Sequence, residues 1–174
     1  EGTMFYDCVI DTGCYHNSGS HHTVSGLNSQ ASYALLKANA VTNLYVGPCF
    51  IASHADSPVN AAIQSCTRAV VNGLYSFASG PTVSLALISM ISPFVQNCTL
   101  NGTDSTGKGI LATDCSDLRT STNNIRAFTT AIEAAGTTTA TCFEPFFTNI
   151  NMIKSGTGAV RTIRSRLQAS NTYG

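Results

Sequence analysis

From residue 28 onward, the spacing of apolar and polar residues predicts helices rather than strands. In Asn28–Tyr45, and again between Ser57 and Gly80, apolar residues recur at steps of three and four, the period of an amphipathic helix. The second segment also has boundary signals. Ser57-Pro58 suits an N-cap followed by proline at the first helical position, and Gly80-Pro81 suits a helix end. These two segments are therefore predicted to be amphipathic helices.

The segment Thr82–Gln96 is apolar almost all round, which is typical of a helix at the centre of a bundle. A buried strand over Val83–Ile91 is the alternative, because a short apolar run suits either element. Further helices are expected at Ser116–Ala135, from Pro145 to the break at Gly156, and at Ala159–Ala169. Short connections favour antiparallel neighbours. The pattern therefore predicts an all-α, disulfide-stabilised bundle of about five to six helices, although Thr, Asn and Ser are poor helix formers.

Residues 1–27 have no helical period and are rich in Gly, Ser, His and Thr. We expect an irregular N-terminal arm over 1–27 and a helical disulfide-linked domain over 28–174, which together form one domain, as is usual for 174 residues. The sequence begins with Glu1 rather than Met, which suggests a mature form after cleavage of a leader. A boundary chosen for expression is the alternative.

Composition narrows the classes of partner. The charged fraction is 10%, against ~25% in typical globular chains, and nine cations balance nine acids. So few Lys and Arg side chains can neutralise little phosphate, which argues against a nucleic-acid partner. A surface with little net charge repels its own copies weakly, so copies of the same chain are the expected partner. No apolar run is long enough to predict a membrane-spanning helix.

Seven cysteines are dispersed along the chain, and none forms a CxxC pair, so the zinc-ribbon and thioredoxin spacings are missing. We expect disulfides and an oxidising compartment, with the pairing open and one cysteine free or bonded to another chain. One regularity stands out: Cys98 and Cys115 repeat the spacing of Cys49 and Cys66, shifted by 49 residues. This suggests a helical-hairpin repeat or a coincidence. The seven are Cys8, Cys14, Cys49, Cys66, Cys98, Cys115 and Cys142.

Two N-glycosylation sequons lie close together, at Asn97-Cys98-Thr99 and Asn101-Gly102-Thr103. Both fall in a stretch rich in Gly, Ser, Thr and Asn, which predicts an exposed loop. We therefore expect N-linked glycans on Asn97 and Asn101 and an extracellular, secreted glycoprotein.

Three histidines near the N-terminus are weak candidates for a metal site, because imidazole binds zinc, copper and nickel. They are His16, His21 and His22, with His54 as a conceivable fourth ligand. They surround Asn-Ser-Gly-Ser, and a flexible stretch of this kind favours a solvated loop over a metal site that needs fixed geometry. A pH-sensitive contact is a further alternative.

The six residues Val9–Cys14 resemble the Asp-Thr-Gly loop of aspartic proteases, with Cys14 where that family has Ser or Ala. In that family two carboxylates share a proton, and the body of the protein is β-rich. Because the rest of the chain is predicted to be helical, we interpret Asp11-Thr12-Gly13 as a turn between two cysteines.

No other catalytic motif is present: the sequence lacks a nucleophile elbow, a P-loop, a dinucleotide fingerprint and an EF-hand loop. We expect no catalytic residues, no cofactor and no enzymatic activity. The C-terminal run carries Lys154, Arg161, Arg164 and Arg166 without an acid. This run suits a solvated helix face, or a contact with an acidic neighbour or an anionic glycan.

Two functional hypotheses follow. The first is an extracellular structural or assembly subunit of a fibre, coat or matrix, held by disulfides and self-association. The second is a secreted helical carrier of a small apolar ligand, since pockets occur between the helices of bundles. The candidate lining residues for such a pocket are Phe77, Met90, Phe94, Phe146 and Phe147.

Overall fold

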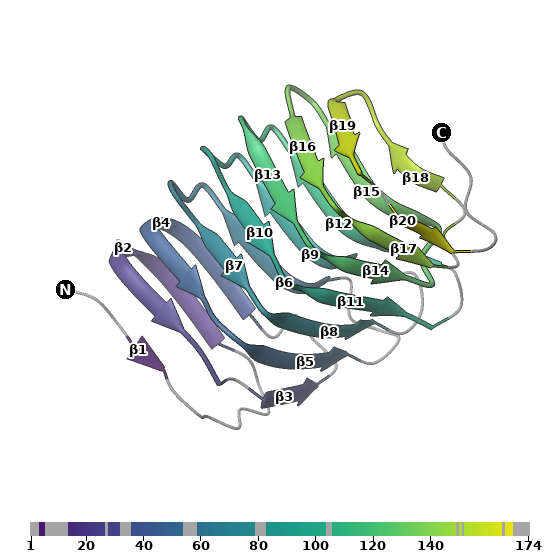
Figure 1. Ribbon diagram of the computed structural model, residues 1–174. Coiled ribbons are helices and arrows are strands. Elements are labelled where there is room, and N and C mark those ends of the chain that lie inside the picture. Colours follow the sequence, from purple (N-terminus) through teal and green to yellow (C-terminus); the bar gives the residue numbers. More distant parts are fainter. Residues whose placement is uncertain are drawn as a thin grey trace.

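The computed structural model describes residues 4–5, 14–26, 28–31, 36–53, 59–78, 83–103, 106–148, 150, 152–164 and 166–168. These residues are all-β and contain no helix, and their parallel strands wind into a β-solenoid (Figure 1). The prediction of an all-α bundle of five to six helices is therefore wrong. Within the described ranges, no helix is long and apolar enough to cross a membrane.

Each turn of the solenoid contributes one strand to each of three faces (Figure 1). The first face contains β6 (Val59–Gln64), β9 (Val83–Ile88), β12 (Lys108–Thr113), β15 (Thr130–Ala135) and β18 (Met152–Ser155). The second face contains β7 (Val70–Asn72), β10 (Phe94–Gln96), β13 (Leu118–Ser121), β16 (Thr139–Phe143) and β19 (Ala159–Ile163). The third face contains β3 (Asn28–Ala31), β5 (Cys49–Ser53), β8 (Leu74–Ala78), β11 (Thr99–Gly102), β14 (Asn124–Arg126), β17 (Phe146–Thr148) and β20 (Arg166–Gln168).

Two long strands join the first and second faces. β4 (Leu36–Val46) pairs with β6 through its first residues and with β7 through its last two. β2 (Cys14–Val24) pairs with β4 along its length, and β1 (Met4–Phe5) pairs with β2. The solenoid therefore has about five turns from β4 to β17, and further strands extend it at both ends.

The length of a turn follows from the register of the first face. Leu36 pairs with Ala61, Ala61 with Leu85 and Leu85 with Ile110, so these turns take 24 or 25 residues. Ile110 then pairs with Ile132, so the next turn takes 22 residues. All five side chains point into the core, and each is 0% exposed. Stacked apolar side chains of this kind form one continuous core along the axis.

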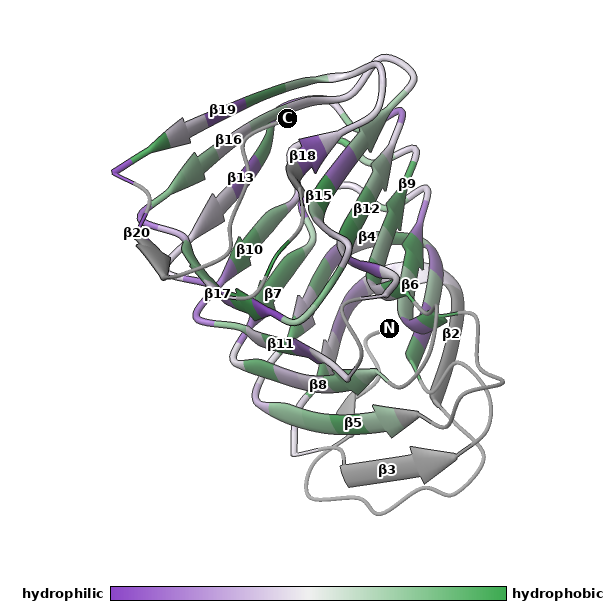
Figure 2. Cartoon of the chain, turned by 90° about the vertical axis from the view of Figure 1, so that its right-hand side faces the viewer, coloured by the Kyte–Doolittle hydropathy of each residue, from purple (hydrophilic) through white to green (hydrophobic). Residues whose placement is uncertain are grey.

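The other two faces complete the core with their own inward side chains. The green segments in Figure 2 show apolar residues recurring along successive strands. The inward residues of the second face include Val46, Val71, Val95, Thr120 and Cys142, and those of the third face include Ile51, Ser76, Leu100, Ile125 and Phe147. Because each turn contacts mainly the turns before and after it, stability is distributed along the stack.

Left-handed residues at the corners explain why the apolar spacing suggested helices. Ser65 and Arg68, between β6 and β7, have φ values of 52° and 54°, and Ser89 and Ser92 repeat this one turn later. Within a short strand, side chains alternate with a period of two. A corner after every three to six residues shifts the phase of that alternation. The resulting average spacing of apolar residues imitates the 3.6-residue period of a helix.

Two segments show most directly how the structure differs from the predicted elements. The run Thr82–Gln96, predicted as a central helix, contains the strand β9, where Ser84, Leu85, Ala86 and Leu87 are buried. The strand alternative given for Val83–Ile91 is therefore confirmed over Val83–Ile88. Within the predicted irregular arm, Cys14–Val24 form β2 and pair with β4. The predicted turn at Asp11-Thr12-Gly13 lies outside the described residues.

The 49-residue shift between the two cysteine pairs corresponds to two turns of the solenoid. Cys49 pairs in register with Leu74, and Cys98 occupies the equivalent corner position one turn after Leu74. The regularity is therefore a structural repeat, but its unit is a turn of three strands rather than a helical hairpin.

The disulfide prediction is also wrong for the cysteines whose side chains are described. Cys66, Cys98, Cys115 and Cys142 are free thiols with at most 1% exposure, and Cys49 is buried as well. They project into the core from different turns, where a thiol packs as a small apolar group. Cys8 lies outside the described residues, and only the backbone of Cys14 is described.

Candidate functional site

Of the histidines considered as metal ligands, His21 and His22 have described side chains, and the two lie in different environments. His21 is exposed, and its Nε2 lies 3.2 Å from Asn43 Nδ2, whereas the adjacent His22 is buried at 6% exposure. Only the backbone of His16 is described, in β2, and His54 lies outside the described residues. Among the side chains that the structure describes, no three His, Cys, Asp or Glu residues cluster as a metal site would require.

The two sequon asparagines occupy different environments. Asn97 is exposed at a left-handed corner, with φ of 52°. Asn101, in β11, is 1% exposed, and its Oδ1 accepts a hydrogen bond from Arg126 Nε at 2.6 Å. Its Nδ2, the atom to which a glycan attaches, is buried. Only Asn97 is therefore presented in the manner expected of an exposed glycan loop.

An exposed polar ladder runs along the corner between the second and third faces. Asn72 Nδ2 donates to Tyr45 Oη at 3.2 Å, and Asn97 Nδ2 donates to Asn72 Oδ1 at 3.0 Å. Thr122 Oγ1 then donates to Asn97 Oδ1 at 2.6 Å. The ladder links four successive turns on the outside of the solenoid. The sequence analysis did not predict this ladder, although short polar residues recur in the sequence at about one-turn intervals.

A second ladder lies inside the corner between the first and second faces, and we call it the axial column: Cys66, Met90, Cys115 and Thr138. The backbone N–H of Val41 donates to Cys66 Sγ at 3.3 Å, and the N–H of Cys66 donates to Met90 Sδ at 3.4 Å. The N–H of Cys115 donates to Thr138 Oγ1 at 3.1 Å. Each of these corner N–H groups is thus satisfied by a side chain of the next turn.

A related contact lies inside the corner between the second and third faces. The N–H of Cys98 donates to Asn123 Oδ1 at 2.9 Å, and Asn123 Nδ2 donates to the carbonyl of Val95 at 3.0 Å. Asn123 is 1% exposed, and both polar atoms of its side-chain amide are hydrogen-bonded to backbone groups. Buried side-chain amides that satisfy corner groups in this way specify a single register between turns.

The buried thiols are protonated and unreactive in this environment. Burial raises the pKa of Cys98 and of Cys142 to about 11, and burial also raises the pKa values of Cys66 and Cys115. Backbone hydrogen bonds offset part of this rise for Cys66, Cys98 and Cys115. Since the thiolate is the nucleophile and the metal ligand, these four groups suit structural roles.

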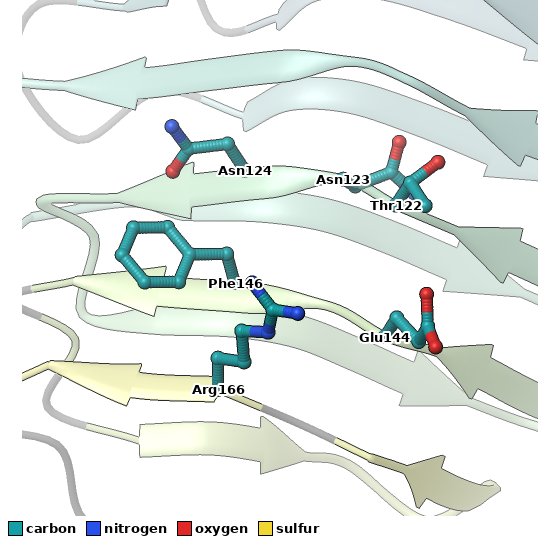
Figure 3. Close-up of a pocket in the computed structure, with 6 residues that line it drawn as sticks. All are labelled: Thr122, Asn123, Asn124, Glu144, Phe146 and Arg166. Carbon is teal, nitrogen blue, oxygen red and sulfur yellow. The ribbon is translucent and has the colours of Figure 1, made fainter.

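Several shallow hollows lie on the outer surface of the solenoid. Figure 3 shows the first, of about 250 Å³, where Phe146 and Arg166 extend from neighbouring strands of the third face. Glu144 lies at its edge, with its Oε1 3.5 Å from Arg164 Nη1. The Oδ1 of Asn124 is buried beside it and has no hydrogen-bond partner among the described residues. This concavity combines an aromatic ring with charged and amide groups.

Two further hollows adjoin each other on the second face, and together we call them the second-face groove; they are lined by residues of β10, β13, β16 and β19. It consists of two hollows of about 430 and 330 Å³ that share Asp117. Arg119 pairs with Asp117 through two contacts, Nε to Oδ1 at 3.2 Å and Nη2 to Oδ2 at 3.0 Å. Phe94 lines one hollow and Arg161 the other. Arg161 was a candidate from the basic run of the sequence. The sequence did not indicate that Phe94, Asp117 and Arg119 lie on the same face as Arg161.

Comparison with known proteins found no matching family model, no matching curated protein and no matching solved structure.

Proposed function

We propose that this chain is an extracellular structural module, a stiff β-solenoid that assembles with copies of itself. The observation that carries the proposal is the axial column, which ties the corners of successive turns together through buried side chains. In a solenoid each turn is stabilised chiefly by its neighbours, so every additional bond between turns stiffens the whole stack. In this proposal the axial column links the turns to one another, which is the role that disulfides were expected to have.

The outer surface supports self-association. Phe50 of β5 and Tyr75 of β8 stack with their ring centroids 5.2 Å apart, and Tyr75 and the nearby Phe77 are each 38% exposed. The chain has no net formal charge, so copies approach one another without strong repulsion. Burying this aromatic surface against a second copy would gain hydrophobic free energy.

The extracellular setting rests on the sequon at Asn97, which lies on the exposed corner between the second and third faces. The cysteines no longer support it, because the four free thiols are buried in the core rather than bonded in pairs. A buried thiol with a raised pKa oxidises slowly, so these thiols are compatible with an oxidising compartment.

The alternative carrier hypothesis needs five residues around a single cavity, and the positions of these residues do not support it. Met90 and Phe147 are buried inside the solenoid, at 1% and 0% exposure. Phe77 is exposed, whereas Phe94 and Phe146 line two different surface hollows. The five residues proposed to surround one apolar ligand therefore face different spaces.

Analytical ultracentrifugation over a wide range of protein concentration tests the assembly proposal. We expect an elongated particle whose average mass rises with concentration. The variant Tyr75→Ser should weaken this association. The matched control Phe143→Ser removes an aromatic side chain that is 40% exposed on the second face, and it should leave the association unchanged. A strict monomer at every concentration would contradict the proposal.

A further inference from the structure

The second-face groove suggests a binding role in addition to assembly. Its side chains form one straight row along the solenoid axis. Phe94 is in register with Arg119, Arg119 with Thr141, and Thr141 with Arg161. Neighbouring parallel strands lie ~4.8 Å apart, so the row from Phe94 to Arg161 spans about 14 Å. A long, open and shallow row fits an extended polymer better than a compact small molecule.

The pair of Asp117 and Arg119 presents fixed polar groups to this row. Its side chains are 51% and 61% exposed, and an ion pair so exposed contributes little to stability. The backbone from which Asp117 projects is anchored to the next turn, because the N–H of Asp117 donates to Thr139 Oγ1 at 3.0 Å. A carboxylate that accepts and a guanidinium that donates, side by side, match the hydroxyl groups on neighbouring carbons of a sugar ring.

Phe94 and Arg161 add two further types of contact at the opposite ends of the row. The half-buried ring of Phe94 lines one hollow, so it offers an apolar surface to the C–H face of a pyranose ring. Arg161 is exposed and has no ion-pair partner in the part of the chain that the structure describes. An unpaired guanidinium binds a carboxylate in bidentate geometry.

The charge of the last turn favours an acidic ligand. Residues 152–168 contain four cations and no acid, namely Lys154, Arg161, Arg164 and Arg166. Arg161 is the one that lines the second-face groove, while Arg166 projects from β20 on the third face. Arg164 is paired with Glu144 of the preceding turn, and the remaining three cations attract a polyanion toward the end of the groove.

We propose that the second-face groove binds a linear uronic-acid polysaccharide. Phe94 packs under a sugar ring, the Asp117–Arg119 pair binds ring hydroxyls, and Arg161 binds a uronate carboxylate. The polymer runs along the solenoid axis, across β10, β13, β16 and β19. The site requires one copy of the chain and does not depend on self-association.

Isothermal titration with an oligogalacturonate, and with a dextran oligomer of similar length as the neutral comparison, tests this proposal. We expect binding of the oligogalacturonate that weakens as salt is added, and no measurable binding of dextran. The variant Arg161→Gln should weaken binding about tenfold, as the loss of a charge-assisted bidentate contact predicts. Phe94→Leu keeps apolar bulk but removes the ring, and it should weaken binding about threefold or more.

Arg166→Gln is the matched control, because it removes the same charge from the same turn on a different face. It should change affinity by about twofold or less, since only long-range attraction is lost. Thermal unfolding of each variant ensures that the folded protein is compared. Failure to bind oligogalacturonate, equal binding of dextran, or equal losses from Arg161→Gln and Arg166→Gln would each overturn the proposal. Titration of a strictly monomeric sample keeps this result separate from the assembly proposal.

Discussion

The backbone N–H of Cys66 donates a hydrogen bond to the Sδ of Met90, one turn further along the solenoid, at 3.4 Å. A thioether is a weak acceptor, yet both residues are 1% exposed, so no bulk water reaches this N–H. The Met90 side chain therefore acts as part of the backbone hydrogen-bond network of the preceding turn as well as part of the core.

The substitution Met90→Leu tests this relationship. The two side chains have similar volumes, and such swaps usually cost less than about 1.5 kcal/mol in packing. The leucine side chain has no acceptor, so the Cys66 N–H would lose its partner, which adds about 1–3 kcal/mol. We expect urea unfolding to show a total loss above that of Leu87→Met, the reverse swap at a buried position whose apolar side chain accepts no hydrogen bond. Equal losses for the two variants would show that the thioether contact contributes nothing.

Thr138 offers a sharper test of the axial column, because its hydroxyl can be removed or retained. Its Oγ1 accepts from the N–H of Cys115 and donates to the carbonyl of Ala135 at 2.7 Å. Thr138→Val preserves the shape and leaves the buried N–H of Cys115 without its acceptor, so we expect a loss of about 1–3 kcal/mol in unfolding free energy. Thr138→Ser retains the hydroxyl and should recover most of that loss. If Ser and Val destabilise equally, packing rather than hydrogen bonding holds this corner.

Two buried thiols make the stability of the fold sensitive to alkaline pH. The pKa of Cys98 and that of Cys142 rise from 9.0 to about 11 on folding, because burial disfavours the thiolate. A raised folded-state pKa stabilises the protein below pH 9. That contribution is lost as the pH rises toward 11. Each thiol therefore contributes about 3 kcal/mol that disappears across this interval.

Urea unfolding of the wild type and of the Cys98→Ala/Cys142→Ala double variant at pH values from neutral to strongly alkaline measures this contribution. Other groups titrate in both proteins, so the difference between their two pH profiles isolates the thiols. We expect the wild type to lose more stability than the variant as the pH rises. Parallel profiles would show that the thiols do not carry the effect.

The sequons predict a selective pattern of glycosylation. When the protein is secreted from eukaryotic cells, we expect a glycan on Asn97, which is exposed, and none on Asn101, whose Nδ2 is buried. Mass spectrometry of glycosidase-treated peptides distinguishes the two sites. Asn97→Gln should abolish the glycan signal, and Thr103→Ala should leave it unchanged. Occupancy of Asn101 in folded protein would contradict the burial of this residue.

Several features could be predicted from the sequence because they depend on local chemistry. The strand alternative for Val83–Ile91 followed from a short apolar run, and the 49-residue shift of the cysteines matched two turns of the solenoid. The low charge and the basic run that includes Arg161 also needed no coordinates. The many Thr, Asn and Ser residues, which are poor helix formers, were a valid objection to the helical interpretation.

The fold class and the composition of the groove depended on contacts between distant residues. Each strand pairs with residues 19 to 25 positions away, as between Met4 and Thr23 or between Leu36 and Ala61, and the local spacing of residues does not reveal that pairing. The left-handed corners at residues such as Ser65 decide which side chains face the core.

The sequence by itself therefore determined how much apolar surface, charge and hydrogen-bonding capacity the chain carries, because these are sums over residues. Tertiary structure alone decided that Asn101 is buried while Asn97 is exposed, and that the described thiols lie in the core instead of forming disulfides. It also placed Phe94 in one row with Arg161. The physical reason is that the winding of the chain, rather than the order of its residues, sets which side chains become neighbours.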